Sequence, residues 1–462
     1  MKKNVRDFTK GNPVKELLLF SWPIALTLIL QNLYNLADVM IIGRFVGDTA
    51  MGAVGSAGAV SGVLLMVVSG MTTGVSVVLS QHLGAKDYER VKKCLTSSIY
   101  IIVFVAVILT ITGIAASGWI LEMMHVEGEV LTMAKDYLTI IFAGTIATAF
   151  YNAGNSVSRA MGDSVTPMIV LIVTAVINIT LNILFVAQFH MGTRGVAYAT
   201  VIATIISAMV CWVILWHKFT IIHPDRKNLS PDGKAVRQII KIGVPATLQS
   251  STMTIGALVL QTFVNSFTTA ALPVMAAYAA ATKIEQMVSY PPGGVSDGMQ
   301  VFAGQNVGAK KFDRVGKGLS ACMKIMLLYS IFAVLVLVFG GGALMGLFTS
   351  TETTVNVGQQ YLTATAAGIF FCGVDYTLRY TLTGVGDVAA SASLSFFELF
   401  LRIGAAYVLA YYTPLGYVGI FWATPIAWTV TTVLGVIRYK SGKWKLKSLT
   451  GGQEVHRDIE GE

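Results

Sequence analysis

The sequence predicts an all-α integral membrane protein, with twelve transmembrane helices in two pseudo-symmetric six-helix bundles around a central cavity. Three observations predict this fold class. The 462 residues are 54% hydrophobic and only 12% charged, whereas soluble domains carry roughly 25% charged residues. Apolar runs long enough to cross a bilayer recur along the whole chain. The first half of the sequence also returns, in recognisable form, 224 positions later.

The repeat is clearest in a polar connection that occurs once in each half. Ser80–Lys93 reads SQHLGAKDYERVKK and Gly304–Lys317 reads GQNVGAKKFDRVGK. The same offset aligns later positions of the two halves: Gly162, Gly195 and Thr200 with Gly386, Gly419 and Thr424. Because agreement at one offset in separate places is hard to obtain by chance, we interpret the chain as one large unit duplicated.

Twelve apolar runs are the predicted spans. In the first half they fall near 15–42, 50–80, 95–121, 131–158, 166–188 and 195–216. In the second half they fall near 238–266, 270–303, 318–348, 355–381, 388–411 and 417–439. The long polar stretch between them is a linker. The expected domains are therefore an N-terminal lobe 1–216, a cytoplasmic linker 217–237, a C-terminal lobe 238–440 and a cytoplasmic tail 441–462.

Prolines occur near the starts of two matching spans and in the middle of a third. Pro23 and Pro245 occupy matching positions near the starts of spans 1 and 7. The run Pro291–Gly294, Pro-Pro-Gly-Gly, is expected to interrupt span 8. In lipid, a break is tolerated only where neighbours or a water-filled cavity satisfy the freed backbone groups.

Basic residues gather on one side of the predicted membrane. They lie in the N-terminus, the linker, the tail and the two repeated connections, while the connections after spans 3 and 9 carry mostly acids. By the positive-inside rule both termini are cytoplasmic, and the net charge of +9 needs no nucleic-acid partner. We expect a monomeric multi-pass protein of the plasma (inner) membrane, with the repeated connections as anchors to anionic lipid headgroups.

One acid stands out at membrane depth, where ionisable groups are costly and usually functional. Asp38 lies in the outer part of span 1, and Asn178 and Asn182 share a face of span 5 at the same depth. Thr200 lies in the outer half of span 6. Such an all-oxygen set suits a hard cation such as Na⁺, whereas a proton needs only the carboxylate. The alternative is an aspartate that merely hydrogen-bonds to helix ends.

The second half does not repeat this set but carries other charges at membrane depth. These candidate cavity charges are Lys283, Glu285, Asp375, Arg379, Glu398 and Arg402. Asp375 and Arg379 are four apart, as are Glu398 and Arg402, so each couple is expected to form an ion pair. Lys283 and Glu285 are two apart and point to different faces. The predicted cation site therefore belongs to the first half alone.

These motifs resemble the bacterial multidrug and toxic compound extrusion (MATE) transporters. The resemblance rests on the repeated GQNVGAKKFDRV-type connection, ATKIEQM with the prolines that follow, SWP at the start of span 1, and Asp38. It implies efflux of drugs coupled to inward Na⁺ or H⁺, with a cation site in the first lobe. Asp38, Asn178, Asn182 and Thr200 match that site, although some members have a second acid where Asn182 stands.

The expected function is therefore secondary active antiport of organic cations or drugs by alternating access, with no cofactor beyond the coupling ion. Tyr34 and Asn35 are candidate substrate-lining residues. The alternative is a flippase for lipid-linked sugars, whose pyrophosphate would need a basic cavity. We do not expect an enzyme, because the six histidines lie in loops, near span ends or in the tail.

Overall fold

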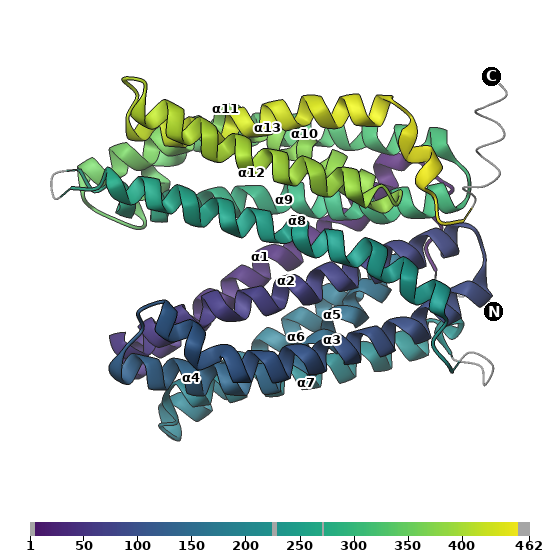
Figure 1. The fold of residues 1–462 in the computed structure, drawn as a ribbon, viewed down its shortest axis with the longest axis horizontal. Coiled ribbons are helices and arrows are strands. Elements are labelled where there is room, and N and C mark those ends of the chain that lie inside the picture. Colours follow the sequence, from purple (N-terminus) through teal and green to yellow (C-terminus); the bar gives the residue numbers. More distant parts are fainter. Residues whose placement is uncertain (1–4, 224–228, 270–271, 451–462) are drawn as a thin grey trace. The chain divides into compact units, whose positions relative to one another are not determined.

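The computed structural model describes residues 5–223, 229–269 and 272–450, and its regular structure within these ranges is helical (Figure 1). The first half comprises α1 (Pro13–Phe45), α2 (Asp48–Gly84), α3 (Tyr88–Met123), α4 (Gly128–Ala143), α5 (Thr145–Ala160), α6 (Val165–Asn182), the π-helical turn η1 (Ile183–Gln188) and α7 (Gly192–Lys218). The second comprises α8 (Gly233–Ser266), α9 (Val274–Gly308), α10 (Phe312–Gly346), α11 (Glu352–Gly384), α12 (Val388–Tyr411) and α13 (Tyr417–Lys440). Short 3₁₀ turns, η2 (Thr220–Ile222) and η4 (Lys443–Lys447), follow α7 and α13.

These helices confirm the predicted fold class. Eight helices of the described chain are long and apolar enough to cross a membrane, and the bent pair α4–α5 makes a ninth. The remaining long helices, α8, α9 and α11, are more polar and complete the twelve spans. In the second half, α11 packs against α9, α10 and α13. It can therefore carry polar side chains that lipid would not tolerate.

Two local features differ from the expectation. The predicted interruption at Pro291–Gly294 is wrong, because α9 runs through both prolines without a break. The fourth span, in contrast, is bent by 52° where α4 meets α5 at Gly144. A Cβ on Gly144 would lie 2.5 Å from a methyl group of Val201, so only glycine allows this close approach to α7.

Residue contacts divide the chain into two compact units, each described here by itself. The first unit contains Leu26–Thr247, and the second contains Phe8–Ala25 together with the chain from Leu248 onward. The chain therefore passes from one unit to the other within α1 and again within α8. The division of the sequence at the linker 217–237 stays a prediction, and residues 224–228 of that linker and 451–462 of the tail lie outside the described ranges.

Candidate ion-binding site

Four predicted side chains of the first unit form one chain of hydrogen bonds. Asn182 Nδ2 donates to Asp38 Oδ1 over 2.6 Å and to Asn178 Oδ1 over 2.8 Å. Asn178 Nδ2 in turn donates to Thr200 Oγ1 over 3.2 Å. Helices α1, α6 and α7 thus each contribute to one cluster, and the sequence could place these groups only at a common depth.

The register of α6 explains why the two asparagines meet. They are one helical turn apart, so both side chains project from the same face, and both are fully buried. Directly after Asn182 the helix widens into the π-helical turn η1. Such turns recur at functional sites because the extra residue re-aims the side chains around it. Nothing in the local sequence predicted this turn.

An apolar cluster begins one helical turn from the polar residues in α1, after α6 and in α7. Ile42, Val186 and Val196 are almost completely buried there, with Tyr137 of α4 packed against them. They lower the effective dielectric on this side of the polar chain. A charged carboxylate in such surroundings is costly unless a cation or a proton compensates it.

Tyr34 also belongs to this cluster. Its hydroxyl hydrogen-bonds to Asp38 and to Thr200. The sequence suggested only a substrate-lining role for Tyr34. The four-residue spacing from Tyr34 to Asp38, which places both on one face of α1, is the signal that could have found this contact. Its neighbour Asn35 is exposed and remains only a candidate for substrate contact.

The donors and acceptors of the cluster suit a small cation. Asn182 Oδ1 is buried without a hydrogen-bond partner. Together with the Asp38 carboxylate and the hydroxyls of Thr200 and Tyr34, it offers only oxygen ligands, as Na⁺ prefers. In the part of the chain that the structure describes, no basic side chain forms an ion pair with Asp38. Within this part of the chain, the Asp38 carboxylate therefore has a neutral hydrogen-bond partner, Asn182, and no ionic one.

In the second unit, buried acids form ion pairs with arginines. Arg379 Nη2 lies 2.5 Å from Asp375 Oδ2, and Arg379 Nη1 lies 2.8 Å from Glu398 Oε2. Glu398 also pairs with Arg402. Both predicted couples are present, and Glu398 joins them into one charge-balanced chain, Asp375–Arg379–Glu398–Arg402. We call this set the ion chain.

The two charges of α9 take part in none of the ion pairs of the ion chain, although Glu285 is close enough to Arg402 to interact with its charge. Lys283 is exposed, whereas Glu285 is partly buried and accepts a hydrogen bond from the Tyr361 hydroxyl. Tyr361 stacks edge-on against Tyr278 and Phe421. The expected separation of Lys283 and Glu285 onto different helix faces agrees with these surroundings.

Comparison with known proteins matches both halves of the chain to one protein family. The family model MatE matches residues 23–184 and 245–408, once in each half. The chain is 27% identical over 451 residues to "Probable multidrug resistance protein YoeA" of Bacillus subtilis, covering 96% of both chains. It is 24% identical over 450 residues to "Probable multidrug resistance protein NorM" of Thermotoga maritima, covering 96% of this chain and 95% of the relative.

Solved structures agree with this fold. One described as the outward-facing conformation of a multidrug resistance MATE family transporter of the MOP superfamily matches with a TM-score of 0.90. The match covers 96% of this chain and 99% of that one, at 22% sequence identity. At this identity the likeness establishes the architecture, while the residues of the site must be argued from this chain.

Proposed function

Because the chain belongs to the MatE family of bacterial transporters, we propose that it is an antiporter that exports organic cations and drugs in exchange for Na⁺ or H⁺. Its full-length relatives are named as multidrug resistance proteins. The single observation that carries the coupling part of the proposal is the cluster around Asp38, a half-buried acid with oxygen neighbours and no basic partner among the described residues.

The cluster supplies a simple exchange step. Without a cation, the Asn182 amide group donates to Asp38 and to Asn178. A cation at Asp38 takes over the carboxylate oxygen, and Asn182 can then present its unpartnered Oδ1 to that cation. This rearrangement disturbs the hydrogen bond between Asn182 and Asp38, which joins α6 to α1. Coupling follows if the drug binds the cation-free and cation-loaded arrangements with different affinity.

The free energy available limits what one ion can achieve. A tenfold ion gradient supplies about 1.4 kcal/mol, and a potential of 100 mV supplies about 2.3 kcal/mol for each net charge moved. One proton exchanged for one monovalent drug moves no net charge, so it sustains only about a tenfold drug gradient. A larger gradient needs two ions per drug.

The arrangement of charges weakens the alternative of a lipid-linked sugar flippase. A pyrophosphate would need basic groups that are free to bind it. Arg379 is almost completely buried between Asp375 and Glu398, and Arg402 pairs with Glu398. Lys283 alone among the predicted basic cavity residues is exposed.

Dye efflux from everted membrane vesicles tests the proposal. Na⁺ and pH gradients are imposed separately, and dye accumulation is followed in vesicles with the wild-type protein and with Asp38→Asn. We expect one of the two gradients to drive accumulation in the wild type and neither to do so in Asp38→Asn. Gradient-driven accumulation by Asp38→Asn at the wild-type rate would remove Asp38 from the mechanism.

The protein is a multi-pass membrane protein of the cell membrane. We propose further that both termini and the linker face the cytoplasm, because the basic connections gather there. We also propose that the monomer is the transporting unit. Protease cleavage of a tag at either terminus in everted, but not in right-side-out, vesicles would test the orientation.

A further inference from the structure

The repeated connection of the second half binds the segment that precedes α1. The backbone N–H of Phe8 donates to Gln305 Oε1 over 3.0 Å. The carbonyl oxygen of Phe8 accepts from Asn306 Nδ2 over 3.2 Å and from Arg314 Nε over 2.9 Å. The Phe8 ring is fully buried and packs edge-on against Phe20 at 4.9 Å between ring centroids. Both polar groups of one backbone residue are thus satisfied by this connection.

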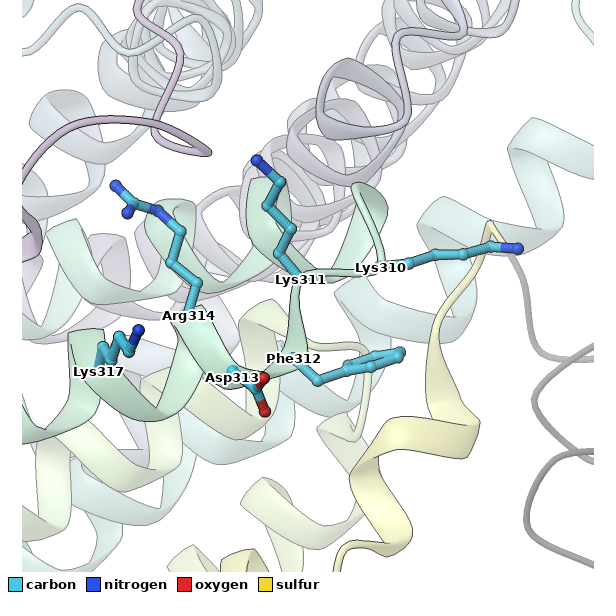
Figure 2. Close-up of a pocket in the computed structure, with 6 residues that line it drawn as sticks. All are labelled: Lys310, Lys311, Phe312, Asp313, Arg314 and Lys317. Carbon is cyan, nitrogen blue, oxygen red and sulfur yellow. The ribbon is translucent and has the colours of Figure 1, made fainter.

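Two neighbouring residues of the segment are held in the same way. Lys311 Nζ donates to the carbonyl oxygen of Thr9 over 2.9 Å, and Arg314 Nη2 donates to the carbonyl oxygen of Lys10. Figure 2 shows Lys311 and Arg314 reaching toward the same side of the connection, while Lys310 extends away from them. Thr9 is buried, although it lies near the start of the chain.

The repeated connection of the first half contacts the segment that precedes α8 through a side-chain ion pair instead of through the backbone. Arg90, the repeat partner of Arg314, places Nη1 3.2 Å from Asp232 Oδ2. Asp232 is itself the repeat partner of Phe8, 224 positions away. Its backbone N–H donates to Ser97 Oγ over 2.9 Å, and its carboxylate accepts from the N–H of Ala235 over 2.9 Å.

Matching glycine pairs hold the helices that follow these segments. A Cβ on Gly70 of α2 would lie 2.5 Å from the backbone N of Thr247 in α8, and one on Gly74 would lie 2.6 Å from the carbonyl oxygen of Ile239. Their repeat partners Gly294 and Gly298 of α9 make the same kind of contact with α1. Paired glycines four apart allow helix backbones to pack closely in membranes.

In α9 the contact with α1 is equally tight. A Cβ on Gly294 would lie 2.6 Å from the backbone N of Ala25, and one on Gly298 would clash with Ser21 Oγ. Leu17, Phe20 and Ile24 of α1 are buried in the same cluster as Phe302 of α9. The first turns of α1 therefore belong to the core of the second unit, and those of α8 to the first unit.

We propose that each repeated connection, with the glycine pair before it, is a binding site for the entrance of the other half's first helix. We call each such site a clasp. The clasps remain closed while transport proceeds, so the cytoplasmic ends of α1 and α8 move with the opposite half. In both units the crossing lies two residues beyond a helix proline, after Ala25 beyond Pro23 and after Thr247 beyond Pro245. This assigns Arg90, Lys311 and Arg314 to the clasps rather than to lipid headgroups.

Thiol accessibility tests the second-half clasp without reference to transport. The four native cysteines are buried, so a cysteine introduced by Thr9→Cys can be followed with a maleimide in purified protein in nanodiscs. We expect Arg314→Gln to raise the labelling rate of this cysteine at least tenfold, because the carbonyls of Phe8 and Lys10 each lose the hydrogen bond that Arg314 donates. The matched control Lys317→Gln removes one charge from the same basic pocket and should leave the rate unchanged.

The same measurement separates the clasp from a lipid anchor. Nanodiscs of zwitterionic lipid alone are compared with nanodiscs containing one anionic lipid in three (~30%, in excess over the bound charge). The clasp predicts the same Arg314→Gln effect in both. An equal effect of Lys317→Gln, a change of less than twofold in Arg314→Gln, or an effect that appears only with anionic lipid would overturn the clasp.

A cross-link tests whether the clasp stays closed, and this part rests on the proposed efflux. Thr9→Cys and Lys311→Cys are joined by a short bis-methanethiosulfonate reagent, which forms a disulfide with each thiol that a reductant can cleave, and dye efflux is compared before and after joining. We expect at least half of the efflux to remain. Loss of efflux that a reductant restores would show that the clasp must open. If the unjoined variant and the wild type do not transport at all, the proposed function fails while the labelling result still decides the clasp.

Discussion

The two halves of this transporter place different chemistry at the same positions of one repeated fold. Asn178 and Asn182 of α6 correspond to Arg402 and Ala406 of α12, and only Thr200 keeps its counterpart, Thr424. In the first half the result is a chain of hydrogen bonds that ends on Asp38. In the second half, Arg402 is instead one end of the ion chain.

We interpret this difference as a division of roles between the two halves, one exchanging an ion and the other stabilising the fold. A buried ion chain that contains its own counter-charges gains little from an external ion, and removing one member leaves an uncompensated charge. Asp38 has only neutral hydrogen-bond partners among the described residues, so a cation or a proton from solution can supply its counter-charge. We therefore assign ion exchange to the first half and a structural role to the second.

The largest expected effect comes from breaking the ion chain. Arg379→Met leaves Asp375 and Glu398 buried without their shared cation, which should lower the free energy of unfolding by about 3–5 kcal/mol. Thermal unfolding of the purified protein in detergent measures this loss. The matched control is Lys283→Met, which removes an exposed charge from α9 and should change stability by less than about 0.5 kcal/mol. Equal stability of the two variants would contradict a structural role for the chain.

A smaller but functional effect is expected at the centre of the first-half cluster. Asn182→Leu keeps the number and branching of the side-chain heavy atoms and removes both hydrogen bonds that Asn182 donates, at a cost of about 1–3 kcal/mol. Because the lost groups serve Asp38, we expect the ion concentration for half-maximal efflux to rise at least tenfold. Efflux from everted vesicles at graded Na⁺ or pH measures it, and an unchanged ion dependence would exclude Asn182 from the ion site.

Thr200 and Thr424 occupy matching positions in the two halves. The same substitution at Thr424 is therefore a control for the substitution at Thr200. Thr200→Val removes the hydroxyl that accepts from Asn178, worth about 1 kcal/mol, and should raise the same half-maximal ion concentration about fivefold. Thr424→Val makes the identical change at the corresponding position of the second half and should leave ion dependence unaltered. A shift of the same size in both variants would mean that the two halves share the ion.

Much of the fold followed from the sequence, for reasons visible in particular residues. The apolar runs located the spans because the bilayer sets their length. The four-residue spacing of Asn178 and Asn182 placed them on one face, and the same rule paired Asp375 with Arg379. These predictions needed only local periodicity.

Long-range features were harder to predict. The ion pair between Arg379 and Glu398 joins two helices, and no spacing rule connects them. The contacts of Lys311 and Arg314 with the segment before α1 were not predicted, because basic residues near a membrane favour a lipid interpretation. The repeated glycines Gly70 and Gly294 were the available signal, since the 224-residue offset aligns them. The bend at Gly144 depends on its contact with α7 and has no counterpart in local sequence.

The most direct test of the central claim measures drug affinity rather than transport. Binding of a fluorescent cationic dye to purified protein is titrated across Na⁺ concentration and pH, for the wild type and for Asp38→Asn. We predict that the coupling ion weakens dye binding at least tenfold in the wild type, about 1.4 kcal/mol of coupling, and that Asp38→Asn binds dye with one ion-independent affinity. Ion-dependent dye binding of wild-type size in Asp38→Asn would contradict the assignment of ion exchange to the first half.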